Sequence, residues 1–451
     1  MLIILSDLHL TDNSCGISIT ADAFHVFTER LSEMAMRASW RDDGSYRPID
    51  EINILLLGDI LDPLHSTLWL DSELDTPEYT RPWTDRSKPQ YAAKLMQITS
   101  AILEKNAESL EALRNAKVEV PRQLESQRHW RDADDLVEIP VHSFYMIGNH
   151  DWYYGIPGPR FDEIRAEVVA ALGLAQSKAP FPYTPKDSAQ IAAMLEKYRV
   201  YAVHGDRFDT FNFDPNEPGR IHSALGDVFT VEMLNRFPVE VARQLPELPE
   251  KVIDNFRELS HVRPALATTL WVSSQIKHND LPDDTQSKIK DIWEKMGADF
   301  LALDVVRDFD KKMEFDSVDK LEIALNISKL ASFQTINDIA LWIQEKVWGG
   351  DISYAKYALE EEAFKEKKAN YIVYGHTHHH ELRPLDTEES GDKLGEQVYF
   401  NSGTWHTFYD LAVNKPYEQK FIPYQVSTYL LFYKDDERGG HKFETLSATF
   451  S

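Results

Sequence analysis

The sequence has almost no cysteine, and this scarcity excludes one class of fold. Cys15 is the only cysteine among 451 residues, so no intramolecular disulfide can form. Small folds stapled by disulfides are therefore excluded, and a single thiol suits a reducing compartment. The core must come from apolar side chains, and 43% of the residues are hydrophobic, which is enough for a large one.

Long apolar runs are missing as well. No run approaches the ~20 residues that a membrane-spanning helix needs. Residues 1–5 are apolar, but they lack a basic flank and Asp7 and His9 follow closely, so we expect a buried first strand rather than a signal peptide. On these grounds we expect a soluble, cytoplasmic protein with no membrane partner.

Basic charge is scarce relative to acidic charge. The 48 Lys and Arg residues face 74 Asp and Glu residues, which gives a formal net charge of -26. Such an excess repels polyanions, so binding to nucleic acid is not favoured and would need a local basic track or bound cations. A role in solubility is the simpler interpretation of the acidic surface.

The apolar runs that are present are short, and each ends in polar residues that could bind a metal. Continuous apolar runs of this length are typical of strands buried on both faces. Taken alone, each polar ending could also be a turn or a helix cap. The runs cover residues 2–5, 52–57, 141–147, 198–203 and 370–374, and the endings are Asp7-x-His9, Gly58-Asp59-x-x-Asp62, Gly148-Asn149-His150-Asp151, His204-Gly205-Asp206 and Gly375-His376-x-His378.

Helical patterns separate these runs. We expect helices over 21–40, 95–113 (one long amphipathic helix) and 161–174, a charged turn region after His378, and closing antiparallel strands over 427–433 and 442–448. Alternating strands and helices predict an α/β fold with parallel strands whose carboxyl ends share one edge, where such sheets bind ligands.

Two segments interrupt the strand pattern. Residues 63–137 lack a strand pattern. Residues 207–369 have hardly any strand signal and show helical periodicity around 252–259, 289–296 and 336–347. The second segment is too long for a loop, so we expect an inserted helical subdomain. The predicted organisation is a core in two parts with a cap between them, and its boundaries are 1–206 (with an insertion at about 63–137), 207–369 and 370–451.

Seven candidate ligands follow the predicted strands. Two divalent cations ~3.5–4 Å apart need a bridging carboxylate, neutral imidazoles and open positions for water and substrate. The set holds oxygen and nitrogen but no sulfur, which suits Mn, Fe or Zn at a catalytic centre better than a structural zinc. The candidates are Asp7, His9, Asp59, Asn149, His204, His376 and His378.

Together, the five endings resemble the ordered motifs of the calcineurin-like metallophosphoesterase superfamily. The resemblance spans residues 7–378 and the closing strands, and it leaves out both insertions. It implies a four-layer α/β/β/α sandwich with a dinuclear metal centre at one edge. The metals implied are two divalent transition ions, with Mn first and Fe or Zn as alternatives.

The resemblance also implies a role for each residue. One metal would bind Asp7, His9 and His378, the other Asn149, His204 and His376, and Asp59 would bind both. His150 would bind neither; it would stabilise the phosphoryl oxygens or protonate the departing alkoxide after attack by a metal-bridged hydroxide. Asp62 and Asp151 would hold neighbouring side chains. Apart from the resemblance, His65 follows Asp62 closely enough that it could reach substrate, whereas His379, His380 and His406 are expected to be incidental.

The substrate is less well defined. Pro63 follows Asp62 where protein phosphatases of this superfamily carry Arg-Gly, which argues against a protein phosphatase. We expect a hydrolase, a phosphatase or phosphodiesterase, whose phosphoester substrate is a small nucleotide-like or other phosphorylated compound. One alternative is a nuclease resembling DNA-repair exonucleases, and another is a scaffold with vestigial catalysis whose helical insertion binds a protein partner. Both insertions leave from strand carboxyl ends, so they should overhang the metals and set substrate choice.

Overall fold

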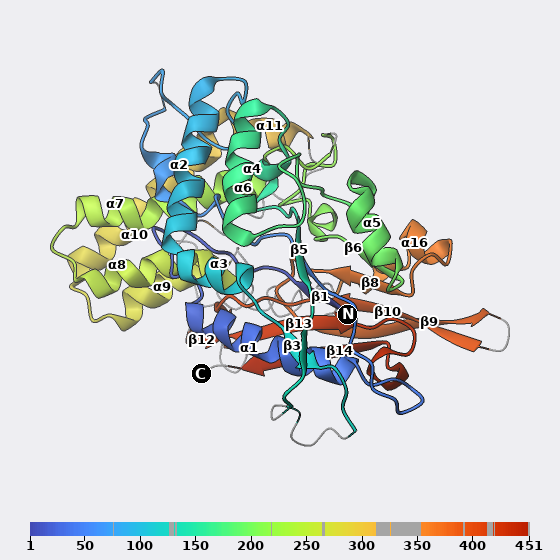
Figure 1. The fold of residues 1–451 in the computed structure, drawn as a ribbon. Coiled ribbons are helices and arrows are strands. Elements are labelled where there is room, and N and C mark those ends of the chain that lie inside the picture. The colour runs from blue at the N-terminus through green and yellow to red at the C-terminus, as the bar shows by residue number, and fades with distance from the viewer. Residues whose placement is uncertain are drawn as a thin grey trace.

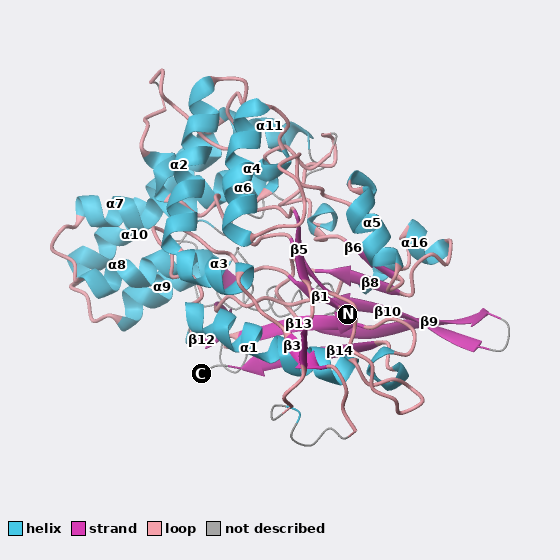
Figure 2. Cartoon of the chain, in the orientation of Figure 1, coloured by secondary structure: helices cyan, strands magenta, loops and turns pink. Residues whose placement is uncertain are grey.

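A computed structural model describes residues 1–74, 76–125, 130, 133–217, 219–263, 267–312, 325, 353–390, 393–412, 418 and 420–449. It shows a mixed α/β architecture, which confirms the predicted α/β class. In Figure 2 most of the helices lie above and to the left of the strands. Within these residues no helix combines the length and apolar character needed to cross a membrane.

The larger sheet carries the first three motifs. Its order is β14-β13-β1-β2-β5, with β1, β2 and β5 parallel and the two closing strands antiparallel. The carboxyl ends of the three parallel strands therefore share one edge, as predicted. The bounds are β1 (Leu2–Leu5), β2 (Ile52–Leu57), β5 (Val141–Met146), β13 (Val426–Phe432) and β14 (Phe443–Thr449).

The smaller sheet carries the other two motifs. Its order is β6-β8-β10-β9, with β6, β8 and β10 parallel and β9 antiparallel to β10. The charged turn region expected after His378 is instead a long hairpin of β9 and β10. Strand β9 lies at the edge of the sheet and carries exposed charged residues. It therefore lacks the apolar pattern that identifies a buried strand in the sequence. The bounds are β6 (Val200–Ala202), β8 (Tyr371–Tyr374), β9 (Glu381–Ser390) and β10 (Lys393–Asn401).

Side chains of the larger sheet alternate between two apolar clusters. Leu2 and Ile4 of β1 join a cluster that they share with the smaller sheet, whereas Ile3 and Leu5 join another that includes residues of α1 to α4. This alternation is the two-residue period of an extended strand, and it explains why the runs are apolar at every position. The helices are α1 (Ala21–Ala38), α2 (Pro89–Lys105), α3 (Ala107–Arg114), α4 (Pro159–Leu172) and, beside β6, α5 (Ala189–Glu196).

The first insertion differs from its prediction in two ways. The single helix expected over 95–113 is two helices, α2 and α3, which meet at Asn106. The Asn106 side-chain amide donates to the Thr11 carbonyl and to the Ile102 carbonyl, both at 2.8 Å, so it stabilises the break. A short strand pair, β3 (Glu119–Pro121) and β4 (Leu136–Glu138), also lies where no strand was expected, because three residues are too few to show a period.

Most of the described part of the second insertion is helical and has an apolar core of its own. Phe237, Phe256 and Trp293 lie at the centre of this cluster, fully buried. In Figure 1 its helices α7 to α10 lie at the left, opposite the β9–β10 hairpin. The helix expected around 336–347 lies outside the described residues. The bounds are α6 (Leu225–Phe229), the π-helix η6 (Thr230–Asn235), α7 (Arg236–Gln244), α8 (Glu250–Arg257), α9 (Thr268–His278), α10 (Asp283–Ala302), α11 (Asp304–Lys312), α15 (Ala355–Ala358) and α16 (Glu362–Lys365).

The second insertion is attached at the edge where the motifs lie. The Asn235 side-chain amide donates to the Leu64 carbonyl at 2.9 Å, and the Trp152 indole donates to Asp227 at 3.1 Å. Farther along, β7 (Val262–Arg263) pairs in parallel with β11 (Phe408–Leu411), which pairs with β12 (Phe421–Tyr424). The insertion therefore contacts the loops after β2 and β5 and the chain after β10.

Candidate metal centre

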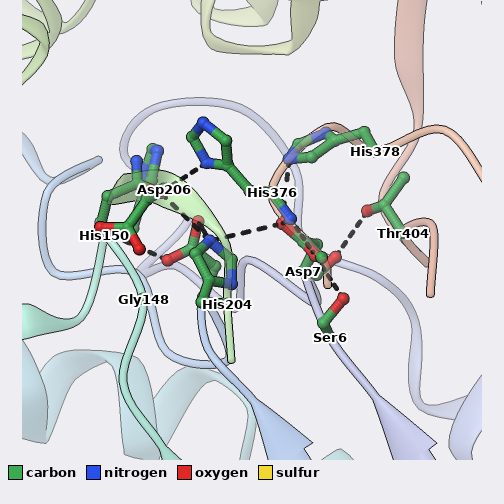
Figure 3. Close-up of polar contacts among 12 residues, drawn as sticks. Ser6, Asp7, Gly148, His150, His204, Asp206, His376, His378 and Thr404 are labelled. Atoms are coloured by element: carbon green, nitrogen blue, oxygen red, sulfur yellow. Dashed lines mark hydrogen bonds and ion pairs between the residues drawn. The ribbon is translucent and has the colours of Figure 1, made fainter. Parts of the chain in front are cut away.

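The loops after five parallel strands bring all seven candidate ligands to one site. Figure 3 shows His204, His376 and His378 around Asp7. Six of the seven side chains are buried; Asp7 and His204 are fully enclosed, and only His376 is partly exposed. Asp7 accepts hydrogen bonds from the Ser6 hydroxyl and from the His376 amide, which joins the loops after β1 and β8.

Five of these ligand candidates have an unusual backbone conformation. A non-glycine residue in the left-handed region costs of the order of 1–3 kcal/mol, and such strain concentrates at functional sites. Backbone bonds between the loops hold it here: the Asp7 amide donates to the Gly58 carbonyl at 3.1 Å, and the His9 amide donates to the Asp59 carbonyl at 2.9 Å. The φ angles are 53° at Asp7, 45° at His9, 55° at Asp59, 67° at His376 and 62° at His378.

The first group of ligand atoms comes from Asp7, His9 and His378. The Nε2 atoms of His9 and His378 lie 3.0 Å apart, and that of His378 lies 3.4 Å from the Asp7 carboxylate. Burial lowers the pKa of His9 to about 4. Burial, together with the nearby Arg263 guanidinium, also places the pKa of His378 well below its ordinary value. Both rings are therefore neutral, the form in which imidazole binds metals.

The second group surrounds the side-chain oxygen of Asn149. This oxygen lies 3.1 Å from His204 Nε2 and 2.8 Å from His376 Nδ1. The opposite nitrogen of each ring is held elsewhere, since His204 Nδ1 donates to the Leu57 carbonyl at 3.0 Å and His376 Nε2 lies 3.2 Å from Asp209. The remaining ring nitrogens, His204 Nε2 and His376 Nδ1, thus point at the amide oxygen, and nitrogen and oxygen atoms that converge in this way can bind a cation once the rings are neutral.

Asp59 lies between the two groups. One carboxylate oxygen is 3.2 Å from His204 Nε2 and 3.8 Å from His9 Nε2, while the other accepts the His150 amide at 2.8 Å. Burial would raise the pKa of Asp59, but His204 and His150 outweigh it and lower that pKa. The carboxylate is therefore ionised, and it has the position that a ligand shared by two cations needs.

The field of the carboxylates also acts on their neighbours. Burial raises the pKa of Asp7 to about 6, and the charge of Asp59 adds to this rise. Burial would lower the pKa of His204, but Asp59 and Asp7 outweigh it and place that pKa well above its ordinary value. Two buried carboxylates this close to each other favour positive charge at the site.

Asp62 holds three imidazoles at once. One of its oxygens accepts from the Nδ1 atoms of His9 at 2.8 Å, His65 at 2.7 Å and His150 at 2.9 Å. Burial would raise the pKa of Asp62, but His150 and His65 outweigh it and place that pKa well below its ordinary value. A carboxylate oxygen that already accepts three N–H bonds has little capacity left for a metal, so Asp62 orients rings rather than binding an ion.

His150 stands apart from both ligand groups. Its Nδ1 donates to Asp62, and its ring stacks on His65 with centroids 5.0 Å apart. Burial would lower the pKa of His150, but the charges of Asp62 and Asp59 outweigh it and raise that pKa to about 9. The ring is therefore an imidazolium at neutral pH, and its Nε2 can supply a proton.

Asp151 and two glycines shape the loops around the ligands. Asp151 accepts the Gly148 amide at 2.6 Å and the Ile60 amide at 3.0 Å, so it joins the loops after β2 and β5. A Cβ atom at Gly148 would overlap the Asp59 carboxylate, and one at Gly375 would lie 2.5 Å from the carboxylate of Asp7. The ligands therefore approach the backbone too closely for any side chain at these positions.

Two residues of the site carry no sequence signal that we recognised. Asp209 holds His376, and Arg220 contacts the carboxylate of Asp206 at 2.5 Å and the Asn149 carbonyl at 3.2 Å. Neither residue follows a strand directly. For Asp209, the sequence offers one indication of a role at the site: it lies three residues after Asp206, the last residue of the fourth motif.

The role of Asp62 can be tested by its amide. In Asp62→Asn, one side-chain atom can no longer accept from the three rings, so their orientation is lost. We expect a fall of ~10–100-fold in metal affinity or activity, the usual effect of removing a group that orients a metal-bound imidazole. Titration with Mn²⁺ would measure it, with the exposed Asp85→Asn as a matched control. Unchanged affinity and activity would show that Asp62 has no such role.

The described residues contain three groups that could hold a metal ion: His9, Asp62, His65 and His150; Asp7, His9 and His378; and Asp59, His204 and His376. The last two groups match the ligand sets above, with Asn149 added to the second. No protein-family model matches the chain, and no curated protein is significantly similar to it.

Proposed function

We propose that this chain is a dinuclear-metal-dependent phosphoesterase of the calcineurin-like metallophosphoesterase superfamily. It hydrolyses a phosphomonoester or phosphodiester, with a small nucleotide-like or other phosphorylated compound as substrate. The observation that carries the proposal is the position of the Asp59 carboxylate between two groups of converging oxygen and nitrogen ligands, beside an imidazolium, His150, that belongs to neither group.

The proposal includes a four-layer α/β/β/α arrangement. Its support is the shared apolar cluster between the two sheets and the second cluster between the larger sheet and α1 to α4. Residues of α5, α15 and α16 join the cluster of the smaller sheet, which fits a fourth layer.

The residues fit two divalent cations. Asp7, His9 and His378 would hold one, Asn149, His204 and His376 the other, and Asp59 both. The donor set is oxygen and nitrogen without sulfur, which favours Mn, with Fe or Zn as alternatives. When bound, two such cations acidify a water molecule and neutralise charge on the phosphoryl oxygens.

The protein's own side chains supply the proton and the orientation. The imidazolium of His150 donates its Nε2 proton to a phosphoryl oxygen or to the departing alkoxide. Asp62 holds its Nδ1, so the ring cannot turn away from the site. General acid catalysis of this kind contributes ~10²–10⁴-fold in rate.

A substrate panel tests the proposal. The purified chain, loaded with Mn²⁺, is expected to bind two ions and to hydrolyse p-nitrophenyl mono- or diesters or cyclic nucleotides. Single- and double-stranded DNA belong in the same panel, because cleavage of DNA alone would favour the nuclease instead. A folded protein that binds no transition metal would contradict the proposal and support a scaffold.

A further inference from the structure

A small polar pocket adjoins the ligand group of Asp7, His9 and His378 on the side of the second insertion. Five parts of the chain build it: the loops after β1 and β2, residues 260–263 of the insertion, and the segments around 378 and 406–408. The cavity measures about 10 Å³, which is room for one water-sized group. Its lining is His9, Thr11, Cys15, Asp62, His65, Ser260, His261, Arg263, His378, His406, Thr407 and Phe408.

Three polar atoms in this lining are buried and have no hydrogen-bond partner among the residues that the structure describes. They are His65 Nε2, Ser260 Oγ and His378 Nδ1, and the three residues are only 5%, 3% and 7% exposed. Each such atom costs ~1–3 kcal/mol, so native proteins seldom leave one unpaired. Three unpaired polar atoms around one cavity indicate that a polar ligand binds there and supplies their hydrogen bonds.

The hydrogens on these atoms indicate the kind of ligand. The Ser260 hydroxyl can donate, and His378 Nδ1 carries the hydrogen of its neutral ring when Nε2 binds a cation. His65 Nδ1 already donates to Asp62, so its Nε2 can only accept, as from a water or hydroxyl hydrogen. Two of the three unpaired atoms in the lining can therefore donate, and donors suit an anionic oxygen.

Arg263 adds a positive charge to the pocket. Its place is set by β7, in which it lies opposite Asp410 of β11. Its Nη1 donates to the Ser260 carbonyl at 2.8 Å and to the Val262 carbonyl at 3.2 Å. Within the described part of the chain, Nε and Nη2 have no acceptor and no carboxylate pairs with the guanidinium. Half of the guanidinium is thus left for a ligand.

This lack of a partner distinguishes Arg263 from the buried arginines. Arg81 contacts Glu232 at 2.7 Å, Arg220 contacts Asp206 at 2.5 Å, and Arg165 pairs with Asp162. Arg263 instead lies near the carboxylates of the metal centre without forming an ion pair with them. Burial lowers the pKa of Arg263, and the negative charges of Asp7 and the other carboxylates of the centre partly offset this lowering. Once cations neutralise those carboxylates, the guanidinium can attract an anionic ligand.

We propose that Arg263 binds a non-bridging phosphoryl oxygen of the substrate, which enters this pocket beside the metals and also accepts from Ser260. The inference rests on the proposed function and extends it, because it makes the inserted segment part of the active site. Arginine offers a planar pair of N–H donors suited to phosphate.

The variants Arg263→Gln and Arg263→Lys test this inference. With Mn²⁺ bound, we expect Arg263→Gln to raise the KM for p-nitrophenyl phosphate and the inhibition constant of inorganic phosphate by about tenfold or more, the effect of one lost charged hydrogen bond. Arg263→Lys keeps the positive charge but loses the planar pair of N–H donors, so its effect on both constants should be intermediate. The matched control is Arg257→Gln, an exposed arginine of α8 that pairs with Asp254 and should change neither constant.

Manganese content and thermal stability distinguish this role from a structural one. Both should match the wild type in the Arg263 variants, because Arg263 touches none of the ligands. Unchanged constants with Mn²⁺ retained would overturn the inference and leave the proposed function intact. Loss of Mn²⁺ or of folding in both variants would also overturn it, since Arg263 would then support the fold. A wild-type protein that neither binds Mn²⁺ nor hydrolyses the panel would instead contradict the proposed function.

Discussion

Replacing Asp59 by asparagine is expected to disturb both metals and to lower activity by about 10³-fold or more. The change removes the one negative charge that lies between the two ligand groups, 3.2 Å from His204 and 3.8 Å from His9. Stabilisation by a metal centre is worth several kcal/mol, and 10³-fold corresponds to about 4 kcal/mol. The amide has nearly the same size and can still accept the His150 amide, so the fold should survive.

The measurement for Asp59→Asn is the Mn²⁺ stoichiometry of the purified variant, followed by a titration that resolves the two affinities. The surface variant Asp85→Asn controls for the loss of a carboxylate as such. We expect weaker binding at both positions rather than at one. A variant that retains two ions with wild-type affinities would show that Asp59 does not bridge them.

Replacing His150 by alanine is expected to affect chemistry and spare the metals. For a substrate with a poor leaving group we expect kcat to fall by ~10²–10⁴-fold, because the departing alkoxide then lacks its proton donor. A p-nitrophenyl ester, whose leaving group needs no proton, should lose much less. Metal content should stay nearly unchanged, since His150 Nδ1 is held by Asp62 and the ring belongs to neither ligand group.

Rates over a series of leaving groups of rising pKa give the sharpest measurement for His150→Ala. The wild type should depend weakly on the leaving group, and the variant strongly. The exposed His25, which pairs with Glu108 on the surface, provides a control as His25→Ala. Equal loss of metal in His150→Ala and Asp59→Asn would refute the division of roles between the two residues.

Much of the fold could be predicted because its strands are buried on both faces. A strand such as β2 must be apolar at every position, so its run stands out in the sequence, and the polar residues that follow it mark the sheet edge. Strands and contacts that have no apolar run of their own were not predicted. The edge strand β9 and the short strands β3 and β4 are defined by partners rather than by their own periodicity, and the helix break at Asn106 depends on the distant Thr11 carbonyl.

The sequence by itself determined the candidate ligands, because each one follows an apolar run directly and the endings repeat five times. Only the tertiary structure decided how these side chains are held. Asp62 lies 88 positions before His150 and Asp209 lies 167 before His376, yet these contacts orient the rings. Arg263 belongs to no motif, and one pairing, between β7 and β11, brings its guanidinium to the pocket. The burial of a segment determines its apolar pattern and can be predicted from that segment alone. A hydrogen bond between distant segments changes the pattern of neither segment, so it cannot be predicted from their sequences.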